Sequence, residues 1–534
     1  KYMMKNLIPY SVAVSALAST CLPLVMNAQT VIDETQLSRK NVLFIAVDDL
    51  KPLLGCYGDP VAQTPHIDRL STRGTVFMSA YCQQAVSAAT RASLLTGMCP
   101  DRTRVWDLKT LIRSQNPDVV TLPQYFKENG YRVAGIGKIY DPRSVDKQQD
   151  ARSWSEEYME HAQFINAGFE QPVMAQYQSP EIHELYNKYY KEAEAQGMDK
   201  KNQIEKYIQK YVKPTTECAD IPDNAYPDGA IADGAVRFLT DYHSDKPFFL
   251  AVGFKKPHLP FCAPKKYWDL YHRETMPLAT YRKKAVGSPE FAYHKCGELQ
   301  LYTDIPSLIS FSDIENVKIP DEKAHELVHG YYACISYIDA QIGKIVEALE
   351  KSGCLNNTII VLWGDHGWHL GDHGLWNKHT NFEQATHVPF LLIDPSSPAQ
   401  KVTTPVEFLS IYPTLCDLVG LKKPLNLDGE SLVEVVKGKK DVVNIKPYAV
   451  SQYPRVGKMG YSLRDGRYRY TVWLNWKDKK TDTTKILAEE LYDYAKDPDE
   501  TVNVAANSDY ADALQQMKRY WEEYKKTRIV RNEK

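Results

Sequence analysis

Two pairs of polar residues come directly after apolar, strand-like runs in this sequence. They are Asp48 with Asp49, after residues 41–47 (NVLFIAV), and Asp365 with His366, after residues 358–363 (TIIVLW). Buried parallel strands of an open α/β sheet place their sites at the carboxyl ends, so both pairs can converge there. Carboxylate oxygens are hard ligands that suit calcium or magnesium. The pattern therefore predicts a divalent-cation site at one edge of a sheet.

A second segment, residues 87–97 (SAATRASLLTG), begins with Ser87 and continues to Arg91. Considered alone, it is the small-residue start of a helix, with Ser87 as its N-cap. It also fills every fixed position of the pattern Cys or Ser, any residue, Pro or Ala, any residue, Arg, followed by Leu, any residue, Thr and Gly. In this it resembles the formylglycine-dependent (type I) sulfatases.

The resemblance implies that Ser87 is oxidised to 3-oxoalanine, the formylglycine residue. Because residue 87 is Ser and not Cys, it further implies the anaerobic, radical-type maturation enzyme as a transient partner. The aldehyde hydrate carries two hydroxyls on one carbon, so one can attack sulfur and the other can later collapse to expel sulfate. An unmodified serine would instead be trapped as a stable sulfate ester.

The same resemblance assigns a calcium site, with magnesium as the alternative, and a set of cationic and proton-donating residues. The implied metal ligands are Asp48, Asp49, Ser87, Asp365 and His366. The implied catalytic residues are Ser87, Arg91, Lys138 in GIGKIYD, His258 in FKKPHLPF and Lys378 in GLWNKHTNF. The cations would stabilise charge on the sulfate oxygens, and His258 would protonate the departing alcohol oxygen.

One position departs from the family pattern. Many sulfatases carry a histidine three residues after the lysine that matches Lys138, and this chain has Asp141 there. The base that assists the second step is therefore left open, with Asp141 as a candidate.

Phrases flanking the signature are most similar to those of the iduronate-2-sulfatase subgroup. They are QQAV before Ser87, PDRTRVWDL after it, and ATHVP near residue 387. This similarity implies removal of the 2-O-sulfate of a uronic acid in heparan, heparin, dermatan or chondroitin sulfate oligosaccharides. The uronate carboxylate would need its own cationic partner. The candidates by proximity to the motifs are Arg102, Arg104, Lys255 and Lys256.

Two other classes of function stay open at this point. The same scaffold and metal site serve phosphonate monoester hydrolases and phosphodiesterases, although the complete signature favours sulfur. A protein whose Ser87 is never oxidised would be a non-catalytic, sulfated-glycan-binding protein.

The elements that must position these residues read as an alternation of buried strands and helices. Apolar runs near residues 41–47, 131–135, 247–253, 358–363 and 388–393 predict strands. Ile335, Ile338, Ile342, Ile345 and Leu349 form one helical stripe. We expect an α/β sandwich with a large, mostly parallel sheet flanked by helices, and the resemblance implies that it is alkaline-phosphatase-like.

The chain is long enough for a second, smaller unit. We expect a catalytic domain over residues 38–440, with a polar, helical insertion near 145–215, and a C-terminal α+β subdomain over 441–534. In the latter, YSLRDGRYRYTVWLN predicts an antiparallel hairpin that turns at Asp465-Gly466 and precedes a terminal helix.

Residues 1–28 have a lysine-bearing start, an apolar stretch and a small-residue cleavage site, and thus predict a secretory signal peptide. A membrane anchor is the alternative, although the apolar run is short and broken by serines; lipidation at Cys21 is another. A periplasmic enzyme is expected, with no membrane span in the mature chain.

The ten cysteines show no CxxC spacing, so at most one or two isolated disulfides are expected. A formal net charge of -2 gives no bias toward nucleic acid, so an anionic substrate must meet local basic residues.

Overall fold

The computed structural model describes residues 39–169, 177–307, 319–439 and 446–529. The predicted signal peptide and Cys21 lie outside these ranges. Among the described residues, no helix is long and apolar enough to cross a bilayer. The nine cysteines in these ranges are all free, so none of the disulfides that the sequence left open is formed there.

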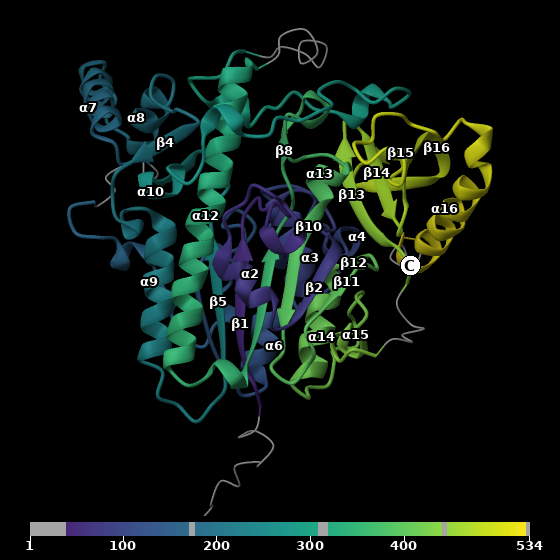
Figure 1. Ribbon diagram of the computed structural model, residues 1–534, viewed down its shortest axis with the longest axis horizontal. Coiled ribbons are helices and arrows are strands. Elements are labelled where there is room, and N and C mark those ends of the chain that lie inside the picture. Colours follow the sequence, from purple (N-terminus) through teal and green to yellow (C-terminus); the bar gives the residue numbers. More distant parts are fainter. Residues whose placement is uncertain (1–38, 170–176, 308–318, 440–445, 530–534) are drawn as a thin grey trace, which may run out of the picture.

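A central sheet of eight strands forms the middle layer of the molecule (Figure 1). In order these are β11 (Gln400–Val402), β2 (Thr75–Tyr81), β10 (His387–Ile393), β7 (Thr358–Gly364), β1 (Asn41–Val47), β5 (Phe248–Phe254) and β3 (Arg132–Gly137), with β12 (Val406–Glu407) also paired with β2. Of these strands, β10 alone runs antiparallel to its neighbours. The expectation of a mostly parallel sheet is therefore confirmed.

Helices cover both faces of this sheet because successive residues of each buried strand point to opposite sides. Leu43 and Ile45 of β1 join the core beneath α2 (Pro65–Ser71), α9 (Pro227–Thr240) and α12 (Asp321–Lys351). Val42 and Phe44 join the core beneath α3 (Ser87–Thr96), α6 (Leu122–Glu128) and α14 (Ile411–Leu418). A strand that is apolar on both faces reads as a continuous hydrophobic run, which is why the β1 sequence lacks alternation.

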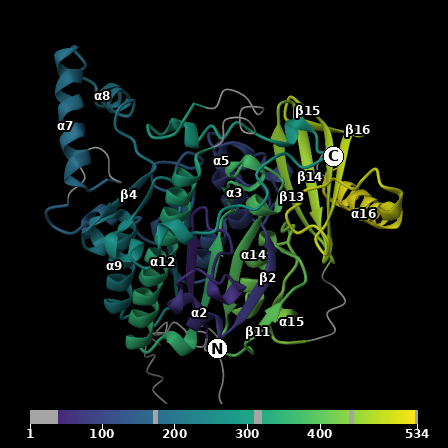
Figure 2. The same ribbon diagram turned by 45° about the horizontal axis from the view of Figure 1, so that its top comes forward.

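A separate four-stranded antiparallel sheet lies beside the sandwich, on the right in Figures 1 and 2. Its strands are β13 (Ala449–Arg455), β14 (Lys458–Arg464), β15 (Tyr468–Lys477) and β16 (Lys480–Asp493), followed by α16 (Ala511–Tyr524). β14 and β15 pair around the expected turn. β13 also contacts the chain just before α3, because Gln452 donates its backbone N–H to Gln83 (2.8 Å).

Within residues 145–215 the structure has two longer helices, α7 (Pro180–Ala195) and α8 (Lys201–Ile208), which stand away from the sandwich in both views (Figures 1 and 2). They pack on each other around Tyr186, Ile204 and Ile208. The remaining short elements are α4 (Pro100–Thr103), α5 (Ile112–Gln115), α10 (Lys265–Trp268), α13 (Glu383–Thr386), α15 (Val433–Val436), β4 (Thr216–Ala219), β6 (Phe261–Pro264), β8 (His369–Leu370) and β9 (Trp376–Asn377).

Candidate active site

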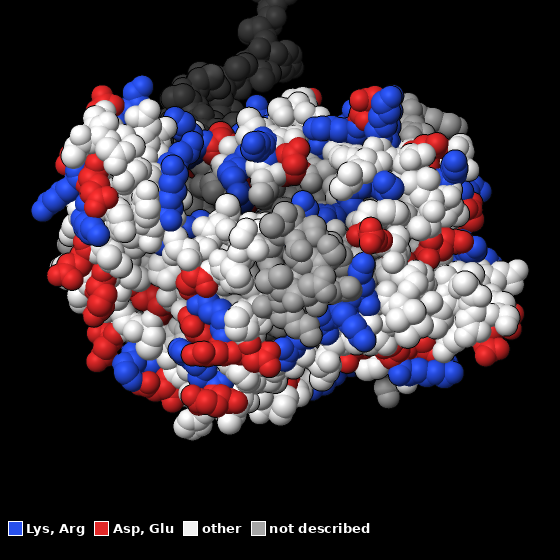
Figure 3. Space-filling model, turned by 90° about the horizontal axis from the view of Figure 1, so that it is seen from above, with Lys and Arg blue, Asp and Glu red and all other residues white. Residues whose placement is uncertain are grey.

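A cavity of about 720 Å³ lies at the carboxyl end of the central sheet. Its lining includes residues that directly follow three neighbouring strands: Asp48 after β1, Lys138 after β3 and Lys255 after β5. Figure 3 shows the molecule from this side, with basic and acidic side chains interspersed over the surface. Positive charge is therefore not spread as a broad field over this face.

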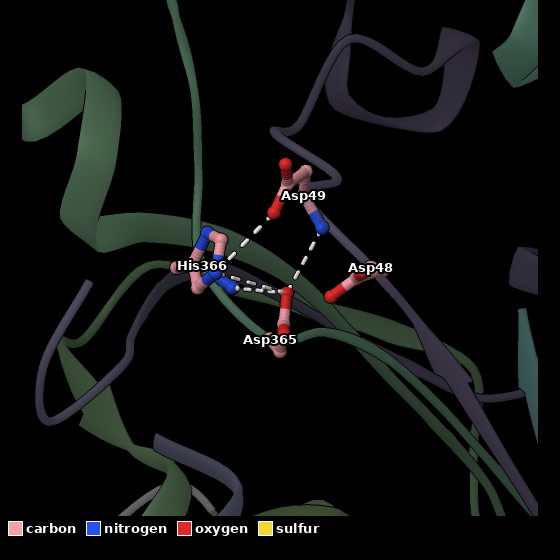
Figure 4. Close-up of side chains that lie close together, drawn as sticks. All are labelled: Asp48, Asp49, Asp365 and His366. Atoms are coloured by element: carbon pink, nitrogen blue, oxygen red, sulfur yellow. Dashed lines mark hydrogen bonds and ion pairs between the residues drawn. The ribbon is translucent and has the colours of Figure 1, made fainter. Parts of the chain in front are cut away.

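Four predicted metal ligands lie together (Figure 4), and one of them, Asp48, lines this cavity. Asp48, Asp49, Asp365 and His366 are buried, and one ligand atom of each lies within 4.8 Å of the others. The convergence follows from strand pairing, because Val47 of β1 is in register with Gly364 of β7. The residue after each strand then enters the same cluster.

Asp49 reaches the cluster through an unusual backbone conformation. Its φ is +59°, a left-handed value that Asp tolerates better than most residues. Its backbone N–H donates to Oδ1 of Asp365 over 2.9 Å. The turn therefore brings two consecutive aspartates to one site, whereas an extended strand would direct them to opposite faces.

Ser87 is the first residue of α3 and lies against this cluster. Its Oγ donates to Oδ1 of Asp48 over 3.1 Å and lies 3.1 Å from Nε2 of His366. Nδ1 of His366 lies 3.1 Å from the carbonyl of Gly367, so Nε2 is the ring nitrogen that faces the acidic cluster. The N-cap of α3 is Val86, so the interpretation of Ser87 as a helix cap was wrong.

Arg91 lies one helical turn beyond Ser87 and is fully buried. Its guanidinium donates to Oδ2 of Asp365 (2.9 Å) and Oδ1 of Asp48 (3.2 Å), and also to the backbone carbonyls of Lys138 and Ile139. The planar fork of arginine matches several acceptors at once. Arg91 thus connects α3 to both halves of the acidic cluster.

Lys138 lies on the other side of Asp48. Its ammonium donates to Oδ2 of Asp48 over 2.5 Å. The end of β3 can lie close to β5 because residue 137 is glycine: a Cβ there would lie 2.0 Å from the carbonyl oxygen of Gly253 on β5. Burial alone would raise the pKa of Asp48, but the charges of Lys138 and Arg91 outweigh it and hold that pKa well below its usual value.

Lys378 and His258 meet at a carboxylate that the sequence motifs did not reveal, Glu298. Lys378 Nζ lies 3.0 Å from both Asp49 Oδ2 and Glu298 Oε2, and His258 Nε2 lies 3.0 Å from Glu298 Oε1. The two neighbours of Lys378, Asn377 and His379, have φ values of +80° and +62°. Non-glycine residues with positive φ are strained and cluster at functional sites.

Hydrogen bonding makes His258 a double donor in this arrangement. Its Nδ1 lies 2.8 Å from the carbonyl of Leu259, which accepts only, and its Nε2 faces the Glu298 carboxylate. Burial alone would lower the pKa of His258, but the Asp49 and Glu298 carboxylates outweigh it and raise that pKa. The protonated imidazole is therefore favoured, as a general acid requires.

The similarity of this chain to known proteins identifies its family. Residues 40–421 match the family described as Sulfatase, and residues 371–527 match the family described as N-sulphoglucosamine sulphohydrolase, C-terminal. The chain belongs to the sulfatase family. It is accordingly a sulfuric ester hydrolase. Enzymes of this family use formylglycine and a metal ion, and the buried acidic cluster of this sulfatase could hold that ion.

Named relatives and solved structures agree with this membership. The sulfatase is 31% identical to human iduronate 2-sulfatase over 93% of its own length and 96% of the relative's. A solved structure described as a 2-O GAG sulfatase superposes with a TM-score of 0.61 at 22% identity, covering 93% of both chains. The phosphonate monoester hydrolase of Agrobacterium radiobacter gives 0.67 at 22%, covering 92% of this chain and 96% of the other. At these identities the two structures show a shared fold alone.

The predicted substrate-binding residues are not all in the cavity of this sulfatase. Arg102 and Arg104 are not among the lining residues, and Arg102 is instead paired with Asp428 (2.7 Å). Lys256 lines the cavity, but its ammonium donates to the carbonyls of His258 (2.9 Å) and Pro260 (2.7 Å) and so holds that loop. The sequence placed these residues by motif proximity, which does not determine where a side chain points.

Asp141 and Lys255 do lie in the cavity lining. Asp141 accepts two hydrogen bonds from the guanidinium of Arg143 and lies 3.9 Å from Lys138 Nζ. The Arg143 interaction holds the pKa of Asp141 below its usual value even though burial opposes the shift. A carboxylate that stays ionised can orient Lys138, but it has little basicity to offer.

Proposed function

We propose that this sulfatase removes the 2-O-sulfate of a uronic acid in heparan, heparin, dermatan or chondroitin sulfate oligosaccharides, using a formylglycine formed from Ser87 and a calcium ion. One observation carries the proposal: Ser87 Oγ is within 3.1 Å of both Asp48 and His366. A group formed at residue 87 would therefore lie against the metal ligands.

The donor set fits a hard divalent cation. Three buried carboxylates and the Nε2 atom of His366 lie close together, and oxygen-rich, flexible sites of this kind suit calcium. Together with the aldehyde hydrate at residue 87, the ion would supply an activated oxygen nucleophile and a positive charge for the sulfate oxygens. Arg91, Lys138 and Lys378 already balance the three carboxylates, so the ion's added charge favours binding of an anionic ester.

The chain's own residues account for the remaining requirements. Lys138 and Lys378 flank the cluster and are fixed by ion pairs to Asp48 and Asp49, so they are preorganised for charge on sulfate. His258 faces the cavity with a proton available for the leaving alcohol oxygen. Arg91 fixes α3, and with it residue 87, against the metal ligands.

The uronate 2-O-sulfate is favoured by the similarity to human iduronate 2-sulfatase, which extends over nearly the whole chain. Secretion to the periplasm, maturation by a radical enzyme, and the division into a 38–440 catalytic domain and a 441–534 subdomain belong to the same proposal. The two family matches overlap between residues 371 and 421, ahead of the proposed boundary, and the second match continues across that boundary to residue 527.

The test is desulfation of 2-O-, 6-O- and N-sulfated disaccharides side by side with the matured enzyme. We expect turnover of the 2-O-sulfated uronate and at most slow turnover of the other two. Ser87→Ala should abolish turnover while the variant still binds the disaccharide. Preferential cleavage of a 6-O- or N-sulfate would refute the assigned position, and a fully active Ser87→Ala enzyme would refute the nucleophile.

A further inference from the structure

Six lysine and arginine side chains line the cavity, and four of them already have oxygen partners. These are Lys138 with Asp48, Lys378 with Asp49 and Glu298, Arg143 with Asp141, and Lys256 with two backbone carbonyls. For the other two, Lys213 and Lys255, the described part of the chain offers no carboxylate within ion-pair distance. The proposed reaction assigns no role to these two ammonium groups.

Lys255 is placed by the same strand pairing that builds the metal cluster. Phe254 at the end of β5 is in register with Val47 at the end of β1, so Lys255 and Asp48 leave the sheet side by side. The backbone is fixed there, because Asp48 N–H donates to the Phe254 carbonyl (3.2 Å) and Lys255 N–H donates to Asp228 Oδ1 (2.6 Å). The position of Lys255 relative to the site is therefore set by the rigid sheet.

The ammonium of Lys255 contacts a neutral partner. Its Nζ lies 3.4 Å from Nε2 of His161, a residue of the insertion between β3 and α9. Burial, together with the charge of Lys255, lowers the pKa of His161 to about 4, so near neutral pH the imidazole is uncharged and accepts a hydrogen bond. This contact orients Lys255 without cancelling its charge.

Lys213 brings a second cation to the same cavity from the same insertion. Its Nζ lies 4.6 Å from the ring centre of Tyr302, which also lines the cavity. A cation over an aromatic face is stabilised modestly, and its charge is not neutralised. Both lysines thus keep a net positive charge on the cavity wall.

We infer that Lys255, assisted by Lys213, binds a second anionic group of the substrate, either a carboxylate or a further sulfate on the sugar. Partly buried ammonium groups that make no ion pair are costly, and an anionic ligand reduces that cost when it binds. The sulfate site and the two lysines share one cavity, so one small molecule can present an anionic group to each. This inference rests on the proposed function, and it makes Lys255 a specificity residue for substrates with at least two negative charges.

The experiment compares a substrate with two charges with one that has a single charge. The matured enzyme is assayed on a 2-O-sulfated unsaturated uronate disaccharide, on its methyl ester, and on 4-nitrophenyl sulfate. Lys255→Met should lower kcat/KM for the disaccharide by about 10- to 100-fold, mainly through KM, and leave 4-nitrophenyl sulfate nearly unchanged. Lys255→Arg should recover most of the loss because it restores the charge.

Two controls separate charge from structure. Lys351→Met removes an exposed lysine at the end of α12, outside the cavity, and should behave as wild type on every substrate. With the methyl ester, the wild-type enzyme should lose the same factor as Lys255→Met if the bound group is the carboxylate. If the loss with Lys255→Met appears only on a disulfated disaccharide, the bound group is the second sulfate.

An equal loss on the disaccharides and on 4-nitrophenyl sulfate, or no loss on any of these substrates with the disulfated disaccharide included, overturns the inference. Failure of the proposed function gives a different result, because the wild-type enzyme itself then does not hydrolyse the disaccharide. In that case the inhibition constants of the same disaccharides against 4-nitrophenyl sulfate hydrolysis provide the readout. They should rise about 10- to 100-fold in Lys255→Met, and an unchanged constant overturns the inference.

Discussion

The Oγ of Ser87 donates a 3.1 Å hydrogen bond to Oδ1 of Asp48, so the first residue of α3 touches the residue that directly follows β1. Both residues are almost completely buried, at 2% and 1% exposure, at the edge of the sheet where Asp365 follows β7. Any group formed at residue 87 shares the electrostatic environment of the acidic cluster. Changes to the cluster therefore act directly on the proposed nucleophile.

Removal of the metal ion should abolish turnover. We expect chelation or Asp365→Asn to lower kcat/KM for a sugar sulfate by at least about 100-fold, because chelation removes the ion and Asp365→Asn removes one of the three carboxylates that would hold it, so the added positive charge is lost in both cases. Calcium should raise the melting temperature of the wild-type enzyme and not that of Asp365→Asn, a readout independent of activity. Asp241→Asn changes an exposed aspartate and serves as the control. A chelator-insensitive enzyme contradicts the metal site.

Loss of His258 should depend on the leaving group. His258→Ala is expected to slow hydrolysis of a sugar sulfate by about 10²- to 10⁴-fold, since the departing alkoxide must be protonated. The loss should be much smaller on 4-nitrophenyl sulfate, whose leaving group needs no proton. The ratio of kcat/KM on the two substrates measures the difference. Equal losses on both would argue against the general-acid role.

Glu298 should control the pH at which His258 loses its proton. A general acid works only while protonated, so activity on a sugar sulfate falls as pH rises through the pKa of His258. Glu298 is one of the two carboxylates that raise this pKa, and Glu298→Gln should therefore move the basic limb of the pH profile to lower pH. Glu290→Gln, at an exposed carboxylate nearby in sequence, should leave the profile unchanged. A basic limb unaffected by Glu298→Gln would show that the carboxylate does not act on His258.

The sequence predicted the sheet and the convergence of Asp48 with Asp365 for a simple reason. Strands that are buried on both faces read as unbroken apolar runs, and parallel strands end at one edge, so the residue after each run is placed by topology. The reversed direction of β10 was not predictable in this way, because an apolar run reads the same in either orientation. β2 was missed as well, although the run of residues 75–81 ahead of the signature has strand character.

Glu298 and Lys213 were missed because they lie in irregular segments, where no periodicity fixes the path of the chain. Only the folded arrangement shows that Glu298 meets Lys378, 80 residues away. Arg102 shows the opposite error: it is close to the signature in sequence, yet its side chain turns to Asp428. Sequence motifs thus indicated the residues that follow regular elements, and not the side chains that complete the cavity wall.

The central claim is that Ser87 becomes the nucleophile by oxidation. The most direct measurement is the mass of the proteolytic peptide that contains Ser87, taken from enzyme preparations with different specific activities. Conversion of serine to formylglycine removes two hydrogens, a loss of about 2 Da. We predict that specific activity rises in proportion to the lighter peptide and is absent where that peptide is absent. Full activity in a preparation that contains only unmodified Ser87 would contradict the account.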